Sequence, residues 1–142
     1  MERSITKAEI SSAVYRHAVE FAKAQGRDEG ELLDELIEES VRIREHPRIN
    51  FKGGPAGRRA WVIGTGLDVW EMIEMYRSMG RETLLESMGN VSEASLEAAL
   101  SYHESYPEEI EAALKENALP PEHWHGLYPE TIQPSPGTSP GD

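Results

Sequence analysis

Six cations within residues 41–60 are the side chains of this chain best suited to bind a charged ligand. The chain of 142 residues is acidic, with a net charge of −12, yet this stretch carries a net charge of +5. Arginine binds phosphate and carboxylate groups through a planar fork of donors, and clustered cations attract anionic surfaces. This basic cluster therefore predicts a binding site for phosphate or for an acidic partner. Its members are Arg42, Arg44, Arg48, Lys52, Arg58 and Arg59.

The later part of the basic cluster surrounds a glycine-rich stretch at residues 53–57. Short β-prone runs at residues 48–51 and 59–63 flank this stretch, which predicts a β-hairpin. Glycines let a partner's backbone approach closely, and the neighbouring arginines suit phosphate or carboxylate. The alternative is that the cations only neutralise nearby glutamates, because local charge balance is common on folded surfaces. The residues that we predict to bind DNA or a protein partner are Arg48, Lys52, Arg58 and Arg59.

The residue types used in catalysis occur here without a catalytic motif. The chain has no cysteine, which excludes a thiol nucleophile and a cysteine-ligated zinc site. Of its five histidines, His123 and His125 lie close in sequence but lack a third fixed ligand, so they make a poor metal site. No phosphate-binding loop, dinucleotide fingerprint or Ser-His-Asp signature is present. We therefore predict that the protein is not an enzyme, with no catalytic residue, no metal and no cofactor.

Two amphipathic helices are predicted before the hairpin. Apolar residues recur every three or four positions over residues 7–25 and again over residues 29–45, so each helix should bury one face. Asp28 is expected to cap the second helix and Pro47 to stop it. We interpret residues 1–45 as an N-terminal helical pair and a dimerisation segment. The two faces consist of Ile10, Ala13, Val14, His17, Ala18, Phe21 and Ala22, and of Leu32, Leu33, Leu36, Ile37, Ser40 and Val41.

A set of short helices is predicted after the hairpin. Residues 64–67 are expected to turn, Asp68 and Glu71 to cap a helix over residues 69–79, and Gly80 to end it. Further helices are predicted over residues 81–88, 93–104 and 107–117. This order is typical of a helix-turn-helix, but the helix at 93–104 carries no lysine or arginine, so we do not expect it to enter DNA. The predicted fold is mainly α (α+β), a helical bundle with a helix-turn-helix-like core and one β-hairpin over residues 46–118.

Residues 119–142 are rich in proline, serine and glycine, and we expect them to form a disordered tail. An aromatic cluster in this tail, with Trp124 and Tyr128, is a candidate partner-binding segment. The alternative is that the cluster packs back on its own domain. The chain starts without a leader sequence and has no apolar run that could span a membrane, so we expect a cytoplasmic protein.

Three motifs resemble the small bacterial domain-of-unknown-function family 433. They are residues 64–70 (GTGLDVW), 96–102 (LEAALSY) and 106–110 (YPEEI), and the resemblance spans about residues 46–115. It implies a β-hairpin joined to a helix-turn-helix-like bundle. It also implies an antitoxin that binds a PIN-like ribonuclease toxin and operator DNA, with no catalytic residues to transfer. The chain departs from the family pattern at Gly66, where an arginine is common, and at Asp68, where a proline is common.

Residues 1–45 lie outside this resemblance and are loosely similar to ribbon-helix-helix repressors, with a strand at residues 3–7. The sequence thus predicts a homodimeric, antitoxin-like regulatory protein that binds a toxin partner and operator DNA through its basic hairpin. The alternative prediction is a protein–protein interaction module that does not bind DNA.

Overall fold

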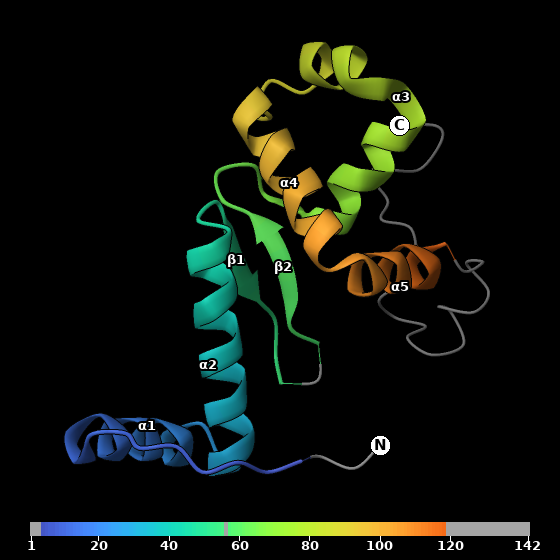
Figure 1. Cartoon of the computed structure of the whole chain (residues 1–142). Coiled ribbons are helices and arrows are strands. Elements are labelled where there is room, and N and C mark those ends of the chain that lie inside the picture. Colours follow the sequence, from blue (N-terminus) through green and yellow to red (C-terminus); the bar gives the residue numbers. More distant parts are fainter. Residues whose placement is uncertain (1–3, 56, 119–142) are drawn as a thin grey trace, which may run out of the picture. The chain divides into compact units, whose positions relative to one another are not determined.

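The structure, a computed structural model, describes residues 4–55 and 57–118, which form two compact units (Figure 1). Among the described residues, the N-terminal unit ends at Pro47 and the C-terminal unit begins at Arg48. Within the described ranges, no helix is both long and apolar enough to cross a lipid bilayer.

The N-terminal unit consists of two helices, α1 (Ser12–Ala24) and α2 (Glu29–Glu45). The side chain of Asp28 accepts a hydrogen bond from the backbone N–H of Glu31 at 3.0 Å, and α2 has the predicted bounds. The predicted start of the first helix at residue 7 is wrong, because the Ser11 side chain caps the helix there by accepting from the N–H of Val14. The strand expected at residues 3–7 is not formed by residues 4–7, and residue 3 lies outside the described range.

The N-terminal unit has very little core of its own. Among its described residues, only Ala22 and Leu32 are buried apolar side chains. Most of the two predicted apolar faces is open to solvent, with Val14 62% exposed and Ile37 54% exposed. The expectation that each helix buries its apolar face is therefore wrong for the single chain.

The C-terminal unit begins with an antiparallel sheet of three strands in the order β1-β2-β3. Strands β1 (Ile49–Lys52) and β2 (Arg59–Val62) form the predicted hairpin. A third strand, β3 (Leu67–Asp68), was not predicted; the turn between β2 and β3 has Gly64 and Gly66 at positive φ of 87° and 74°. This tight turn brings the chain straight back along β2.

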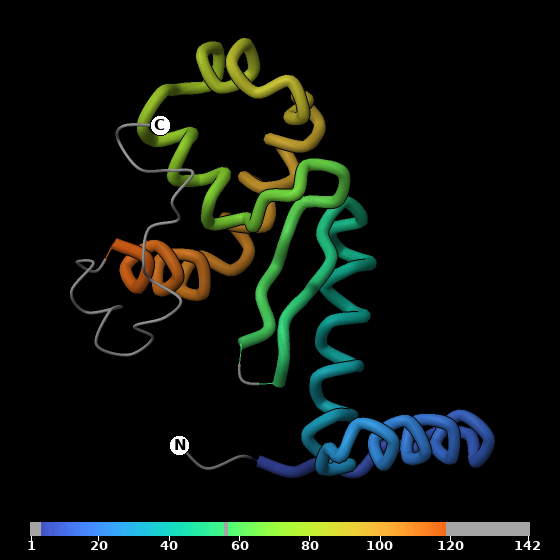
Figure 2. Tube along the Cα trace, turned by 180° about the vertical axis from the view of Figure 1, so that it is seen from behind, coloured from blue at the N-terminus to red at the C-terminus, as the bar shows by residue number. Residues whose placement is uncertain are grey.

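Three helices follow the sheet: α3 (Val69–Ser87), α4 (Glu93–Ser105) and α5 (Pro107–Asn117). Gly80 interrupts α3 with φ 81° and ψ 166°, so the chain forms two helical segments that meet at the residue where the sequence predicted an end. In the tube view of Figure 2 this bend is visible in the light green part of the chain. The mainly α fold with a small antiparallel sheet is thereby confirmed.

The core of the C-terminal unit lies between one face of the sheet and the three helices. Tyr102 is fully buried, donates a hydrogen bond from its hydroxyl to Glu109 at 2.7 Å, and packs against the ring of Tyr106. Burial of apolar side chains supplies most of the stability of such a unit. The largest fully buried side chains are those of Tyr102, Ile49, Met72, Ile73, Leu84, Leu96, Val62 and Val69.

Exposed ion pairs add contacts among the helices. Arg77 of α3 donates two hydrogen bonds to Glu111 of α5, and the imidazole of His103 lies 2.7 Å from the same carboxylate. The hydrogen bonds from Arg77, and then the one with His103, lower the pKa of Glu111 from 4.5 to about 2. Arg81 forms an ion pair with Glu97 of α4.

Candidate functional site

The strand register divides the hairpin into an apolar inner face and a polar outer face. Ile49 pairs with Val62, and Phe51 with Ala60, and these side chains face the helices. The intervening pairs are Asn50 with Trp61 and Lys52 with Arg59, which therefore share the opposite face because strand side chains alternate. The sheet thus places two of the predicted binding residues directly across from each other.

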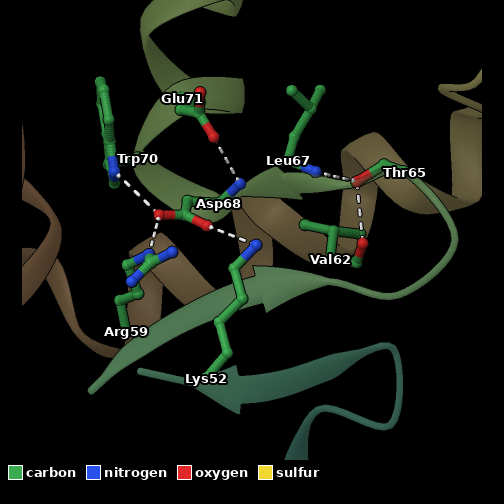
Figure 3. A network of polar contacts seen from close by, with 8 residues as sticks. All are labelled: Lys52, Arg59, Val62, Thr65, Leu67, Asp68, Trp70 and Glu71. Atoms are coloured by element: carbon green, nitrogen blue, oxygen red, sulfur yellow. Dashed lines mark hydrogen bonds and ion pairs between the residues drawn. The ribbon is translucent and has the colours of Figure 1, made fainter. Parts of the chain in front are cut away.

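Asp68 is the centre of the polar contacts on this face (Figure 3). Its carboxylate accepts hydrogen bonds from Arg59 Nε at 2.7 Å and from the Trp70 indole N–H at 3.2 Å. The ammonium group of Lys52 lies 3.3 Å from the second carboxylate oxygen. The Asp68 side chain is only 7% exposed, so three donors converge on a buried negative charge. Burying a charge is costly unless it is paired and hydrogen-bonded in this way.

Local backbone structure holds Asp68 at this place. It is the N-cap of α3, as the sequence predicted, and Glu71 accepts a hydrogen bond from its backbone N–H at 2.8 Å. The preceding turn is fixed by Thr65, whose hydroxyl donates to the Val62 carbonyl at 2.8 Å and accepts from the Leu67 N–H at 3.0 Å. The carboxylate is therefore attached to two rigid elements, the end of β3 and the start of α3.

The two cations on Asp68 still reach solvent. The side chain of Arg59 is 51% exposed and that of Lys52 is 38% exposed. The Lys52 ammonium also lies over the ring of Trp61, 5.2 Å from its centroid, in cation–π geometry. These cations are thus both balanced locally and held in a fixed orientation at the surface.

The other two predicted binding residues occupy the ends of the hairpin. Arg58 lies in the loop and donates from its guanidinium to the Gly53 carbonyl at 2.9 Å, which closes the loop across its base. Arg48 is exposed and directly precedes β1, four residues from Lys52. At about 3.3 Å per residue this is about 13 Å along the strand. The structure therefore groups Lys52 and Arg59 with Asp68, whereas Arg48 and Arg58 lie apart from that group.

An open pocket of about 350 Å³ lies where the end of the hairpin approaches α5. Arg58 and Arg59 line it from the hairpin, and Glu109 and Glu116 line it from α5, with Trp70 also contributing. Sequence reasoning missed that these glutamates come close to the cations, because the separation along the chain is about fifty residues. The acidic side chains lower the positive potential on this side of the hairpin. Lys52 does not line this pocket, so the outer face of the sheet around it is the more favourable surface for an anionic group.

The described residues offer no site for metal chemistry. No group of three or more histidine, aspartate or glutamate side chains among them could hold a metal ion. The predicted tail segment with Trp124 and Tyr128 lies outside the described residues. Comparison of the chain with protein-family models, with curated proteins and with solved structures finds no match. The resemblance to family 433 therefore stays a prediction from short motifs.

Proposed function

We propose that this protein is an antitoxin-like regulatory protein, and that the outer face of its hairpin binds an acidic surface of a toxin partner. The observation that supports this most directly is the group of Lys52 and Arg59 on buried Asp68. An acidic protein that displays an oriented cation pair on a rigid sheet is suited to bind carboxylates. The resemblance of residues 46–115 makes a PIN-like ribonuclease the partner to test first.

The contact with Asp68 holds the Arg59 side chain in an orientation that is suited to bind a ligand. Its bond to Asp68 uses the Nε–H, and the guanidinium has four further N–H donors that this bond does not use. A side chain that is already held in place loses less conformational entropy on binding, which favours affinity. Arg59 can then form a paired contact with a partner carboxylate, and Lys52 adds a second positive charge beside it.

A protein partner fits the charge distribution better than DNA does. The net charge is −12, and α5 carries carboxylates close to the hairpin, which repel phosphates. Operator DNA remains the second candidate, because a two-stranded ribbon fits the major groove and all four predicted cations lie on or beside two strands.

The test first looks for a PIN-like ribonuclease encoded beside this gene, and then titrates the chain with that ribonuclease and with a DNA duplex from upstream of the gene, at two salt concentrations. The hairpin variant Lys52→Gln/Arg58→Gln removes one cation of the Asp68 group and one of the loop, and it leaves Asp68 bonded to Arg59 and Trp70. The matched control, Arg16→Gln/Lys23→Gln, removes the same charge from exposed positions of α1. We expect the hairpin variant to weaken ribonuclease binding by about tenfold, roughly 1.4 kcal/mol, and the control to leave it unchanged.

A third variant tests the paired contact itself. Arg59→Lys keeps a positive charge beside Asp68 but lacks the planar fork of donors. The unit should therefore still fold, but it should bind the ribonuclease more weakly. Absence of ribonuclease binding by the wild-type chain would contradict the proposal. Salt-sensitive duplex binding that is lost in the hairpin variant would instead support the DNA candidate.

A further inference from the structure

The N-terminal unit has an open apolar groove between its two helices. The groove has a volume of about 560 Å³ and is lined by side chains of α1, α2 and the residues before α1. In Figures 1 and 2 the two helices of this unit meet at a corner. Its lining consists of Ile10, Val14, Tyr15, Ala18, Leu33, Leu36, Ile37, Ser40, Val41 and Arg44.

Two helices of this length require further apolar contact to be stable. α1 has 13 residues and α2 has 17, and in proteins most of the stability of a helix comes from packing of its amphipathic face. The two helices bury only Ala22 and Leu32 among their described apolar residues. Both sequences are nevertheless strongly amphipathic, and the exposed apolar faces are the ones that the periodicity predicted to be buried. The groove is therefore suited to an occupant with an apolar helical surface.

The charges at the two ends of the apolar face of α2 favour a second copy of this chain as the occupant of the groove. Glu29 lies at the start of α2 and Arg44, which lines the groove, lies in its last turn. A twofold axis that passes between Leu36 and Ile37 pairs residue 29 of one helix with residue 44 of the other when the helices run antiparallel. Ile37, the most exposed of the large apolar side chains of α2, then lies at the axis, with an ion pair at each end. Such self-complementarity is the requirement for a twofold interface.

Tyr15 connects α1 to this arrangement. Its hydroxyl donates a hydrogen bond to the Glu29 carboxylate, and its ring lines the groove. This contact fixes the Glu29 side chain beside the apolar stripe, at the point where the antiparallel copy would present Arg44. We therefore infer that the N-terminal unit is a dimerisation module, in which the α2 helices of two copies pack antiparallel and each α1 covers the side of the pair.

The first experiment measures the mass of the full chain in solution by sedimentation equilibrium. We expect the wild type to be a dimer and Ile37→Glu to be monomeric, because this change places two carboxylates at the axis. The matched control is Met79→Glu, an equal change at an exposed helical position of the C-terminal unit, which should stay dimeric. Far-UV circular dichroism of each variant shows whether the C-terminal unit remains folded.

The second experiment tests the register through charge reversal. Glu29→Arg and Arg44→Glu should each weaken self-association by about tenfold or more, because each places like charges at both ends of the interface. When the two variants are mixed, both end pairs again have opposite charges, and a heterodimer should form. A parallel or shifted arrangement would not show this rescue.

Besides a failure of this rescue, two results would overturn the inference. One is a wild-type chain that stays monomeric up to about 0.1 mM, far above the dissociation constant of a specific dimer. The other is a dimer that survives Ile37→Glu, which would place the interface elsewhere. Neither result bears on the hairpin proposal, because the cations tested there belong to the C-terminal unit.

Discussion

Replacement of Asp68 by asparagine should destabilise the C-terminal unit. The substitution keeps the shape of the side chain and removes its charge, so that its effect reports on the polar contacts rather than on packing. Asp68 is buried, whereas its partners Arg59 and Lys52 are partly exposed. The two cations can therefore rehydrate, but the interior loses the acceptor that held them.

The expected size follows from the three contacts. A hydrogen bond to a charged group contributes about 1.5–3 kcal/mol, and the asparagine oxygen can still accept one of the donors. Because Arg59 recovers part of its hydration, we expect a net loss of about 2 kcal/mol in the free energy of unfolding. For a folded unit of this size each kcal/mol shifts Tm by about 4–8 °C, so Tm should fall by about 8–16 °C.

Thermal unfolding followed by circular dichroism measures this difference, and a urea titration checks it at 25 °C. The matched control is Glu104→Gln, which makes the same chemical change at an exposed position of α4 and should alter Tm by a degree or two at most. A double-mutant cycle with Arg59→Gln isolates the pair: the two losses should be strongly non-additive. A loss below about 0.5 kcal/mol in Asp68→Asn would refute the reasoning, and a gain would mean that desolvation of the carboxylate outweighs its contacts.

Three further changes test other features of the C-terminal unit. Gly80→Ala should cost about 1–3 kcal/mol, because φ 81° with ψ 166° is a region open only to glycine; an unchanged urea midpoint would contradict this. Gly53→Ala should open the hairpin loop, because the new Cβ would lie 2.3 Å from the Gly57 carbonyl oxygen; amide exchange in β1 and β2 should then speed up, and unchanged rates would exclude it. Glu111→Gln tests the pKa of Glu111, which Arg77 lowers from 4.5 to about 2. Folding favours the charged form of Glu111, so the contribution of this carboxylate to the free energy of unfolding is complete above about pH 5 and is lost as the pH falls toward 2. The difference in unfolding free energy between wild type and Glu111→Gln should shrink over that range, and a constant difference would argue against the ion pair.

Local signals predicted the helices of this chain well. The bounds of α2 follow from a capping aspartate at one end and a proline just beyond the other. The bend at Gly80 follows from the lack of a Cβ, which permits a backbone angle that no other residue adopts readily. The start of α1 was placed too early because periodicity extends to Ile10, whereas the Ser11 cap decides where the helical hydrogen bonds begin.

Contacts that depend on strand register were beyond the sequence. Asp68 was expected only as a helix cap, and nothing in its local spacing shows that Lys52 and Arg59 reach it. Asp68 lies beside Lys52 and Arg59 because it belongs to β3, and β3 is a strand of two residues that no β-prone run in the sequence indicates. The useful signal was the short turn at residues 64–66, which forces the next residues back along β2. Apolar periodicity identified the faces of α1 and α2 but could not show that the described residues leave most of both faces exposed.

The distribution of charge limits what the hairpin can do on DNA. Arg42 forms an ion pair with Glu38 at 2.7 Å, and Asp68 balances Lys52 and Arg59, so part of the basic cluster is neutralised within the chain. When a protein binds duplex DNA, the logarithm of the binding constant falls linearly with the logarithm of the salt concentration, with a slope of about −0.9 for each neutralised phosphate. Contacts by all four hairpin cations would therefore give a slope of about −3.6, and contacts by Arg48 and Arg58 alone about −1.8. A measured slope steeper than about −4 would require cations outside the hairpin and would refute it as the sole DNA surface. Because Asp68 balances Lys52 and Arg59, we expect a slope of about −2 on DNA, together with tight binding to an acidic protein.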